Sequence, residues 1–232
     1  MVTLKRKPDF KKNLYEKEAW QRLELVCGID EVGRSCFSGP VVAAAAILKP
    51  HVRHPLLQDS KLMTAHERNK AYAWLLKNCT FGVGITHNRL IDSVNIYQAT
   101  LIAMKRALMQ LLSISAEQPS VILVDAMPLK IPFEIPVIHF CYGEQQSKSI
   151  AAASIIAKVT RDALMTRIDS ITPGYKYSDN KGYGTKAHRG GIEREGLTVL
   201  HRMSFAPNRE AAQQPLPILF EEAFFKEEVK RK

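Results

Sequence analysis

Four acidic residues stand where predicted strands end, a position from which side chains can do chemistry. Asp30 and Glu31 are adjacent and follow the apolar stretch "LELVCGI". Asp125 ends the stretch "SVILVD", and Glu144 follows "VIHFCY" and one glycine. Because the ends of neighbouring strands meet at one edge of a sheet, we expect these four side chains to converge. Carboxylates beside buried strands are costly unless a cationic side chain, backbone N–H groups or a metal ion offsets them.

The chemistry of these donors indicates which metal ion would suit them. Four oxygen donors without a nearby Cys or His predict a site for Mg²⁺ or Mn²⁺ rather than Zn²⁺. Two such ions can activate a water and stabilise the leaving oxygen of a phosphodiester. The ordinary alternative is that each acid caps a strand end or forms a salt bridge, and for any single acid that alternative is stronger. For the set of four, the metal site is favoured.

The composition indicates what kind of partner the chain has. It contains 33 Lys and Arg against 23 Asp and Glu, a formal net charge of +10 over 232 residues. Such a charge favours polyanionic partners, nucleic acid before an acidic membrane. The longest apolar runs, "PVVAAAAIL" and "SIAAASIIA", are too short to span a bilayer, and the N-terminal residues do not form a secretory signal. We expect a cytoplasmic protein that binds nucleic acid and no membrane.

The elements that must position the acids follow from hydrophobic periodicity. Strands are expected at 23–30, 41–48, 80–87, 119–128 and 137–142, and helices at 66–78, 95–112 and 147–168. Asn95 is a candidate N-cap of the second helix. This order predicts an α/β layer structure with a mixed sheet. A basic arm at 1–22 precedes a core at 23–172, and a helical region at 173–232 follows it.

Six motifs occur in the order typical of bacterial ribonuclease HII. They are "GIDEVGRS…GPVVAAAAIL", "DSK" at 59–61, "VDA" at 124–126, "SIAAASIIAKVTRD" at 149–162, "KGYGT" at 181–185 and "HRMSFAP" at 201–207. The chain therefore resembles that family over residues 23–207. Too few residues precede Asp30 for the extra N-terminal domain of ribonuclease HIII, so type HII is expected.

The resemblance implies both a fold and an activity. The implied fold is RNase H-like, with a five-stranded mixed sheet flanked by helices and a C-terminal helical region packed on the core. The implied activity is that of a metal-dependent endoribonuclease, which cuts the RNA strand of RNA–DNA hybrids. It also nicks on the 5′ side of single ribonucleotides in duplex DNA, leaving 5′-phosphate and 3′-hydroxyl ends.

The resemblance also implies the catalytic, metal-binding acids. Asp30 and Glu31 match the family's paired metal ligands, and Asp125 matches the third. Glu144 stands where the family normally has Asp after a glycine, so its carboxylate lies one methylene further from the backbone. Asp162 is the alternative fourth acid, although its helical context favours a surface position or an internal ion pair.

Six residues at matching positions are implied to bind substrate. Gly33, Arg34 and Ser35 stand where the family has a Gly-Arg-Gly loop that grips the phosphate and the 2′-hydroxyl of the ribonucleotide. The 2′-hydroxyl is what allows a protein to tell RNA from DNA. Tyr183 matches the tyrosine that packs on the deoxyribose after the ribonucleotide.

Lys61 and Lys181 complete this set as candidate phosphate contacts. The expected partners are an RNA–DNA hybrid or duplex DNA that contains ribonucleotides. The expected cofactors are one or two Mn²⁺ or Mg²⁺ ions, with no organic cofactor, and the protein is expected to act as a monomer.

Two alternatives remain open because Glu144 and Ser35 depart from the family pattern. The first is a catalytically weak protein that only binds RNA–DNA hybrids. The second is an RNase H-like nuclease that acts on DNA. The intact set of three matching acids argues against the first, and Arg34 and Tyr183 argue against the second.

Overall fold

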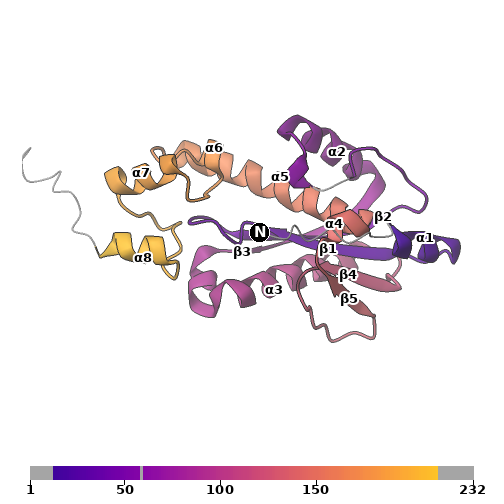
Figure 1. The fold of residues 1–232 in the computed structure, drawn as a ribbon. Helices are drawn as coiled ribbons and strands as arrows, with labels where there is room; N and C mark the ends of the chain where they lie inside the picture. Colours follow the sequence, from indigo (N-terminus) through magenta and orange to yellow (C-terminus); the bar gives the residue numbers. More distant parts are fainter. Residues whose placement is uncertain (1–12, 58–59, 214–232) are drawn as a thin grey trace, which may run out of the picture. The chain divides into compact units, whose positions relative to one another are not determined.

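The computed structural model describes residues 13–57 and 60–213, apart from the side chain of Lys61. Its strands are β1 (Val26–Val32), β2 (Val41–Leu48), β3 (Cys79–Thr86), β4 (Val121–Asp125) and β5 (Val137–Phe140). Its helices are α1 (Leu14–Gln21), α2 (Ala65–Asn78), α3 (Asn88–Ile114), α4 (Gly143–Gln146), α5 (Lys148–Ile171), α6 (Tyr177–Asn180), α7 (Lys186–Glu195) and α8 (Ala206–Ala212), with a short 3-10 helix, η1, at Ser60–Leu62. Figure 1 colours these elements in chain order from indigo to yellow.

The five strands form one mixed sheet in the order β3-β2-β1-β4-β5. β1 lies at its centre, antiparallel to β2 and parallel to β4. β3 pairs antiparallel with β2, and β5 pairs parallel with β4. The predicted α/β fold, a mixed five-stranded sheet flanked by helices, is therefore confirmed.

Helices α3 and α5 lie on opposite faces of this sheet (Figure 1). Every residue of β2 is buried, as expected for the run "VVAAAAIL" between two layers. Gly28 of β1 marks a very close approach between layers, because a Cβ atom there would stand 2.1 Å from the backbone carbonyl carbon of Ser149. The start of α5 is thereby held directly against the strand that carries Asp30.

The helix predicted at 95–112 begins earlier, at Asn88. The reason is a break at Asn95, whose backbone angles are φ 70° and ψ 165°, so that a short helical segment precedes it. The Oδ1 atom of Asn95 accepts a 3.0 Å hydrogen bond from the N–H of Gln98, so the predicted N-cap is confirmed. The preceding segment has its own cap, since Nδ1 of His87 accepts from the N–H of Leu90 at 3.2 Å.

The chain forms two compact units. The first comprises the residues up to Arg34 together with Pro40–Leu164, and it contains the whole sheet. The second comprises Ser35–Gly39 together with the residues from Met165 onward. Within the described ranges, we find no helix with the length and apolar character needed to cross a membrane.

The second unit has a core of its own. Met165, Tyr175, Tyr177 and Ile192 are buried together, with Phe37 packed against them. The short piece Ser35–Gly39 is tied in by backbone hydrogen bonds, from Phe37 N–H to the carbonyl of Gly182 and from Gly39 N–H to that of Leu200, at 2.8 and 2.9 Å. The predicted helical pieces after residue 172 are found as α6, α7 and α8, and the predicted terminal helix or tail lies outside the described residues.

Candidate active site

Asp30 and Asp125 come together because β1 and β4 run parallel. The register pairs Gly28 with Leu123 and Ile29 with Val124, so the next residue of each strand is an aspartate. Asp30 is only 3% exposed. Its Oδ1 atom accepts a 2.8 Å hydrogen bond from the backbone N–H of Glu31.

Glu144 reaches the same place from the first turn of α4. The backbone N–H of Gly143 donates a 2.7 Å hydrogen bond to Oδ1 of Asp125, which ties the start of α4 to the end of β4. Glu144 is 7% exposed, and the hydroxyl of Ser154 on α5 donates to its Oε1 atom at 3.5 Å. Glu144 therefore faces inward, into the space at the end of the parallel strands.

The electrostatics of Asp30 indicate that the other three predicted acids lie near it. Its pKa is raised well above the ordinary value of an aspartate, first by burial and then by the negative charges of Glu31, Glu144 and Asp125. A hydrogen bond from Ser154 opposes this rise. The structure thus brings together acids from β1, β4 and α4, in an arrangement that a cation would stabilise.

The donor set fits a hard divalent cation. In the described part of the chain, no three Asp, Glu, His or Cys side chains already form a ready-made metal cage. Mg²⁺ does not require one, because it keeps several waters and is usually bound by one or two carboxylates together with substrate phosphates. Carboxylate oxygens that repel one another are suitable ligands for such an ion.

Gly33 and Arg34 follow directly after the paired acids of β1. Gly33 has φ 92°, and a Cβ atom there would stand 2.2 Å from Nε of Arg161, so this position requires glycine. Arg161 is fully buried, and its Nε donates to the carbonyl of Pro40 at 2.9 Å. The guanidinium of Arg34 lies 3.7 Å from Oε1 of Glu31, so it is directed toward the acids.

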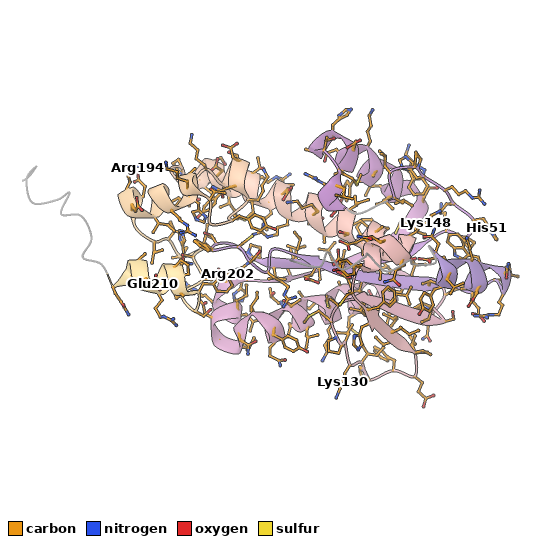
Figure 2. All side chains as sticks on the ribbon, viewed as in Figure 1. His51, Lys130, Lys148, Arg194, Arg202 and Glu210 are labelled. Carbon is orange, nitrogen blue, oxygen red and sulfur yellow. The ribbon has the colours of Figure 1, made fainter. Side chains whose placement is uncertain are left out.

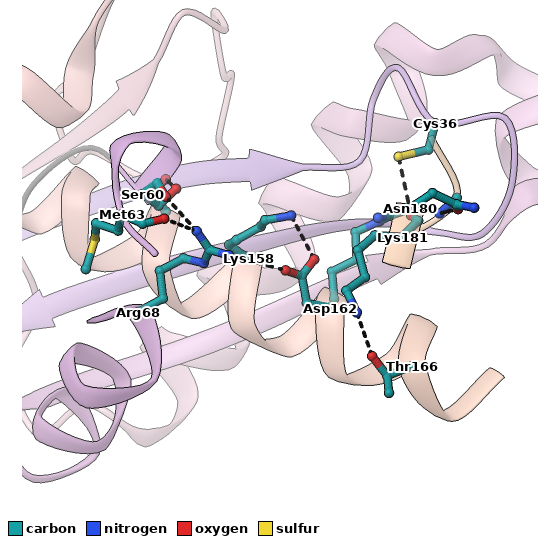
Figure 3. Close-up of polar contacts among 12 residues, drawn as sticks. Cys36, Ser60, Met63, Arg68, Lys158, Asp162, Thr166, Asn180 and Lys181 are labelled. Carbon is teal, nitrogen blue, oxygen red and sulfur yellow. Dashed lines mark hydrogen bonds and ion pairs between the residues drawn. The ribbon is translucent and has the colours of Figure 1, made fainter. Parts of the chain in front are cut away.

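Ser35, Lys181 and Tyr183 belong to the second unit. Ser35 is exposed and precedes Cys36, whose Sγ donates to the carbonyl of Lys181 at 3.7 Å. The ammonium of Lys181 donates to Oγ1 of Thr166 at 2.7 Å (Figure 3). Tyr183 is half-buried. Lys181 thus makes bonds within its own unit, a contact that its motif did not indicate.

Lys61 lies in η1, and Arg68 binds a carbonyl group at its first residue and another just after its end. The guanidinium of Arg68 donates to the carbonyl oxygens of Ser60 and Met63 at 3.2 and 2.5 Å (Figure 3). The Nη2 atom of Arg68 lies 3.9 Å from Oδ2 of Asp162. This clamp fixes the backbone of the turn that carries Lys61.

Asp162 forms an ion pair within α5. Its Oδ1 atom accepts a 2.8 Å hydrogen bond from Nζ of Lys158, one helical turn earlier (Figure 3). The negative charge of Glu144 contributes to the raised pKa of Asp30. The internal ion pair expected for Asp162 is thus present, and Glu144 as the fourth acid stays a prediction.

Two residues of this region were not singled out from the sequence. Ser154 bonds to Oγ of Ser60 at 2.8 Å as well as to Glu144, but in "SIAAASIIA" it looks like a small packing residue. Glu16 is fully buried, and its Oε1 accepts from the N–H of Ser149 at 3.0 Å, at the start of α5. Nothing in the charged N-terminal arm distinguishes Glu16 from its exposed neighbours.

Comparisons with known proteins identify the family of the chain. The profile of the family described as Ribonuclease HII matches residues 27–208. Ribonuclease HII of Lacticaseibacillus paracasei is 48% identical over 197 residues, which cover 84% of this chain and 75% of the relative. Ribonuclease HII of Listeria monocytogenes is 44% identical over 199 residues, covering 85% and 74%.

Solved structures share the fold at lower identity. Ribonuclease H2 from Pyrococcus horikoshii OT3 superposes with a TM-score of 0.63 at 22% identity, covering 87% of this chain and 99% of that chain. Bst-RNase HIII, solved in complex with Mn²⁺, gives a TM-score of 0.66 at 20% identity, covering 84% and 71%. With the family match over most of its length and relatives above 40% identity, the chain belongs to the ribonuclease HII family, nucleases that hydrolyse the RNA of RNA–DNA hybrids.

Proposed function

We propose that this chain cleaves its substrates with one or two Mg²⁺ or Mn²⁺ ions held by Asp30, Glu31, Asp125 and Glu144. The substrates are the RNA strand of RNA–DNA hybrids and single ribonucleotides in duplex DNA, which it nicks on the 5′ side. The observation that carries the proposal is the convergence of four carboxylates from β1, β4 and α4 in a chain of net charge +10. An acidic cluster in a basic protein attracts cations where the rest of the surface attracts phosphates.

The chain's own residues orient the site. When bound, divalent ions in such a site lower the pKa of a water and offset charge on the phosphate. The Gly143 N–H occupies one oxygen of Asp125 and so fixes the direction of the other. Burial of Asp30 and Glu144 strengthens the electrostatic interactions of both carboxylates, because the local dielectric is low. The relative Bst-RNase HIII, solved with Mn²⁺, is consistent with this use of the acids.

Recognition of the ribonucleotide is assigned to the segment after β1 and to the C-terminal region. Gly33, Arg34 and Ser35 would contact the phosphate and the 2′-hydroxyl, and the positive φ of Gly33 supports this, because glycine allows a tight turn directly after the paired acids. Tyr183 would pack on the next deoxyribose, and Lys61 and Lys181 would contact phosphates. These roles fall on a single chain, so the proposal needs neither a second subunit nor an organic cofactor.

The test is cleavage of three labelled duplexes in Mg²⁺ and in Mn²⁺. One duplex is DNA with a single ribonucleotide, one is an RNA–DNA hybrid, and one is DNA throughout. We expect a nick 5′ of the ribonucleotide, cuts along the RNA tract and no cut in DNA, with 5′-phosphate and 3′-hydroxyl ends. Binding of the hybrid without cleavage in either metal would contradict the proposal and favour a hybrid-binding protein.

A further inference from the structure

A basic cavity of about 460 Å³ lies beside α1, on the first unit. Its lining includes three cations from three separate segments: Lys17 of α1, Arg53 of the loop after β2, and Lys148, the first residue of α5. Trp20 and His51 also line it, with their ring centroids 5.8 Å apart. Figure 2 labels Lys148 and His51 beside α1. We call this cavity the α1 pocket.

The charges of the α1 pocket favour an anion. None of the described residues that line it is acidic. Of the two acids next to Lys17 in sequence, Glu16 is fully buried and bonds to the start of α5, and the exposed Glu18 does not line the pocket. Lys17 and Arg53 are exposed and Lys148 is half-buried, so their side chains are accessible to a ligand that binds from solvent. Like charges gathered around one hollow repel each other, and a bound phosphate group would offset that repulsion.

The α1 pocket lies close to the candidate active site. The backbone N–H of Asn13, in the pocket lining, donates a 2.6 Å hydrogen bond to the carbonyl of Gln146, the last residue of α4. Lys148 follows Glu144 by four residues, so their Cα atoms are at most about 14 Å apart. Since each base pair of a duplex advances about 3.4 Å, the pocket lies within a few base pairs of the acids.

We propose that the α1 pocket binds a backbone phosphate of the duplex substrate, a few base pairs from the cleaved bond. This inference rests on the proposed function, because it assigns a second contact to the same substrate. The contact is with phosphate and carries no sequence information. It adds affinity and holds the duplex in register, without taking part in the reaction.

The test compares two triple variants that remove the same charge. Lys17→Ala/Arg53→Ala/Lys148→Ala empties the pocket of its cations, and Lys77→Ala/Lys105→Ala/Lys130→Ala removes three exposed lysines that do not line it. Binding to a duplex with one ribonucleotide is measured by fluorescence anisotropy at several salt concentrations, in the Asp125→Asn background to prevent cleavage. Steady-state cleavage is measured for both triple variants with Asp125 intact.

We expect the pocket variant to bind about tenfold more weakly than the control variant at moderate salt. For the pocket variant, the slope of log K for binding against log salt concentration should be shallower than for the control variant by about 0.9, the change for one lost phosphate contact. In cleavage, KM should rise by about the same factor, while kcat should stay within about twofold because the chemical step is untouched.

The two triple variants could instead show equal affinity and equal salt slope while the parent chain cleaves normally. This result would refute phosphate binding in the α1 pocket and leave the proposed function intact. A parent chain that binds the duplex but never cleaves it would instead refute the proposed function. The salt slopes then still report on the pocket, so the two failures are distinguishable.

Discussion

The backbone N–H of Gly143 donates a 2.7 Å hydrogen bond to Oδ1 of Asp125. This bond joins the end of β4 to the first turn of α4, which carries Glu144. A backbone N–H group thereby links the segments that carry two of the acids. The negative charge of Asp125 in turn helps to raise the pKa of Asp30.

Glu144 should matter for metal use even though the family normally has Asp there. We expect Glu144→Ala to lower kcat at least about tenfold and to raise the Mn²⁺ concentration that gives half-maximal rate, because one hard oxygen ligand is lost. Glu144→Asp keeps the carboxylate and should stay within about tenfold of the parent. Metal-titrated cleavage of the single-ribonucleotide duplex makes the comparison. Full activity of Glu144→Ala with an unchanged metal requirement would show that Glu144 is no ligand.

Tyr183 should affect recognition of the junction between the ribonucleotide and the deoxyribonucleotide that follows it, rather than the chemical step of cleavage. Tyr183→Ala removes the ring that is proposed to pack on the deoxyribose after the ribonucleotide. We expect kcat/KM for the single-ribonucleotide duplex to fall about tenfold more than that for an RNA–DNA hybrid, since stacking of this kind contributes roughly 1–3 kcal/mol. Tyr175→Phe, a change in the core of the same unit, is the control for stability. An equal loss on both substrates would count against the junction role.

The strands and the convergence of the acids could be predicted because they depend on local patterns. Each buried strand has its own apolar run, and Asp30 and Asp125 stand at the ends of such runs. The placement of Ser35–Gly39 could not be predicted, because this piece joins a unit whose other residues begin at Met165. Pairing over such a distance leaves no mark in the local sequence.

The contacts of buried polar residues were the second feature that could not be predicted from the sequence. Glu16 and Ser154 lie among residues of the same type or size that have no such contacts, and only tertiary packing distinguishes them. Glu144 was found because it follows a strand, whereas Glu16 lies in a helix of mixed charge. Position relative to a predicted strand end was thus the signal that the sequence carried.

Glu16 should stabilise the fold by capping α5 from a distance. Its Oε1 atom accepts hydrogen bonds from the hydroxyl of Ser147 and the N–H of Ser149. We expect Glu16→Ala to lower the free energy of unfolding by about 2 kcal/mol and Glu16→Gln, which keeps one acceptor oxygen, by about half as much. Urea denaturation measures both. Glu18→Ala on the exposed side of α1 should change it by less than about 0.5 kcal/mol, and an equal effect of Glu16→Ala and Glu18→Ala would refute the cap.

The second unit should lose stability in mild acid. Its buried rings of His188 and His201 have their Nε2 atoms 3.2 Å apart. Burial, followed by the charge of His188, lowers the pKa of His201 to about 4, and burial also lowers that of His188. The unfolded chain takes up the proton near pH 6.5, while the folded chain does not. Stability is therefore full above that pH, falls as pH drops toward 4, and levels off below it.

The size of this effect for His201 is about 3 kcal/mol. Urea unfolding between pH 4 and pH 7.5 measures it, and His201→Gln should flatten the profile over this range. His66, which is exposed, provides the control, since His66→Gln should leave the slope unchanged. A parent chain and a His201→Gln variant with the same slope would refute the assignment.

The central claim is that the carboxylates of β1, β4 and α4 act together as the metal-dependent cleavage site. Asp125→Asn tests it most directly, because Asn keeps an oxygen that can accept from the Gly143 N–H and loses only the charge. The measurement is the cleavage rate of a duplex with one ribonucleotide over a titration of Mn²⁺, with the melting temperature as a check on folding. We predict a loss of about a thousandfold or more in rate at unchanged stability. A well-folded Asp125→Asn variant that cleaves at the parent rate would contradict the account.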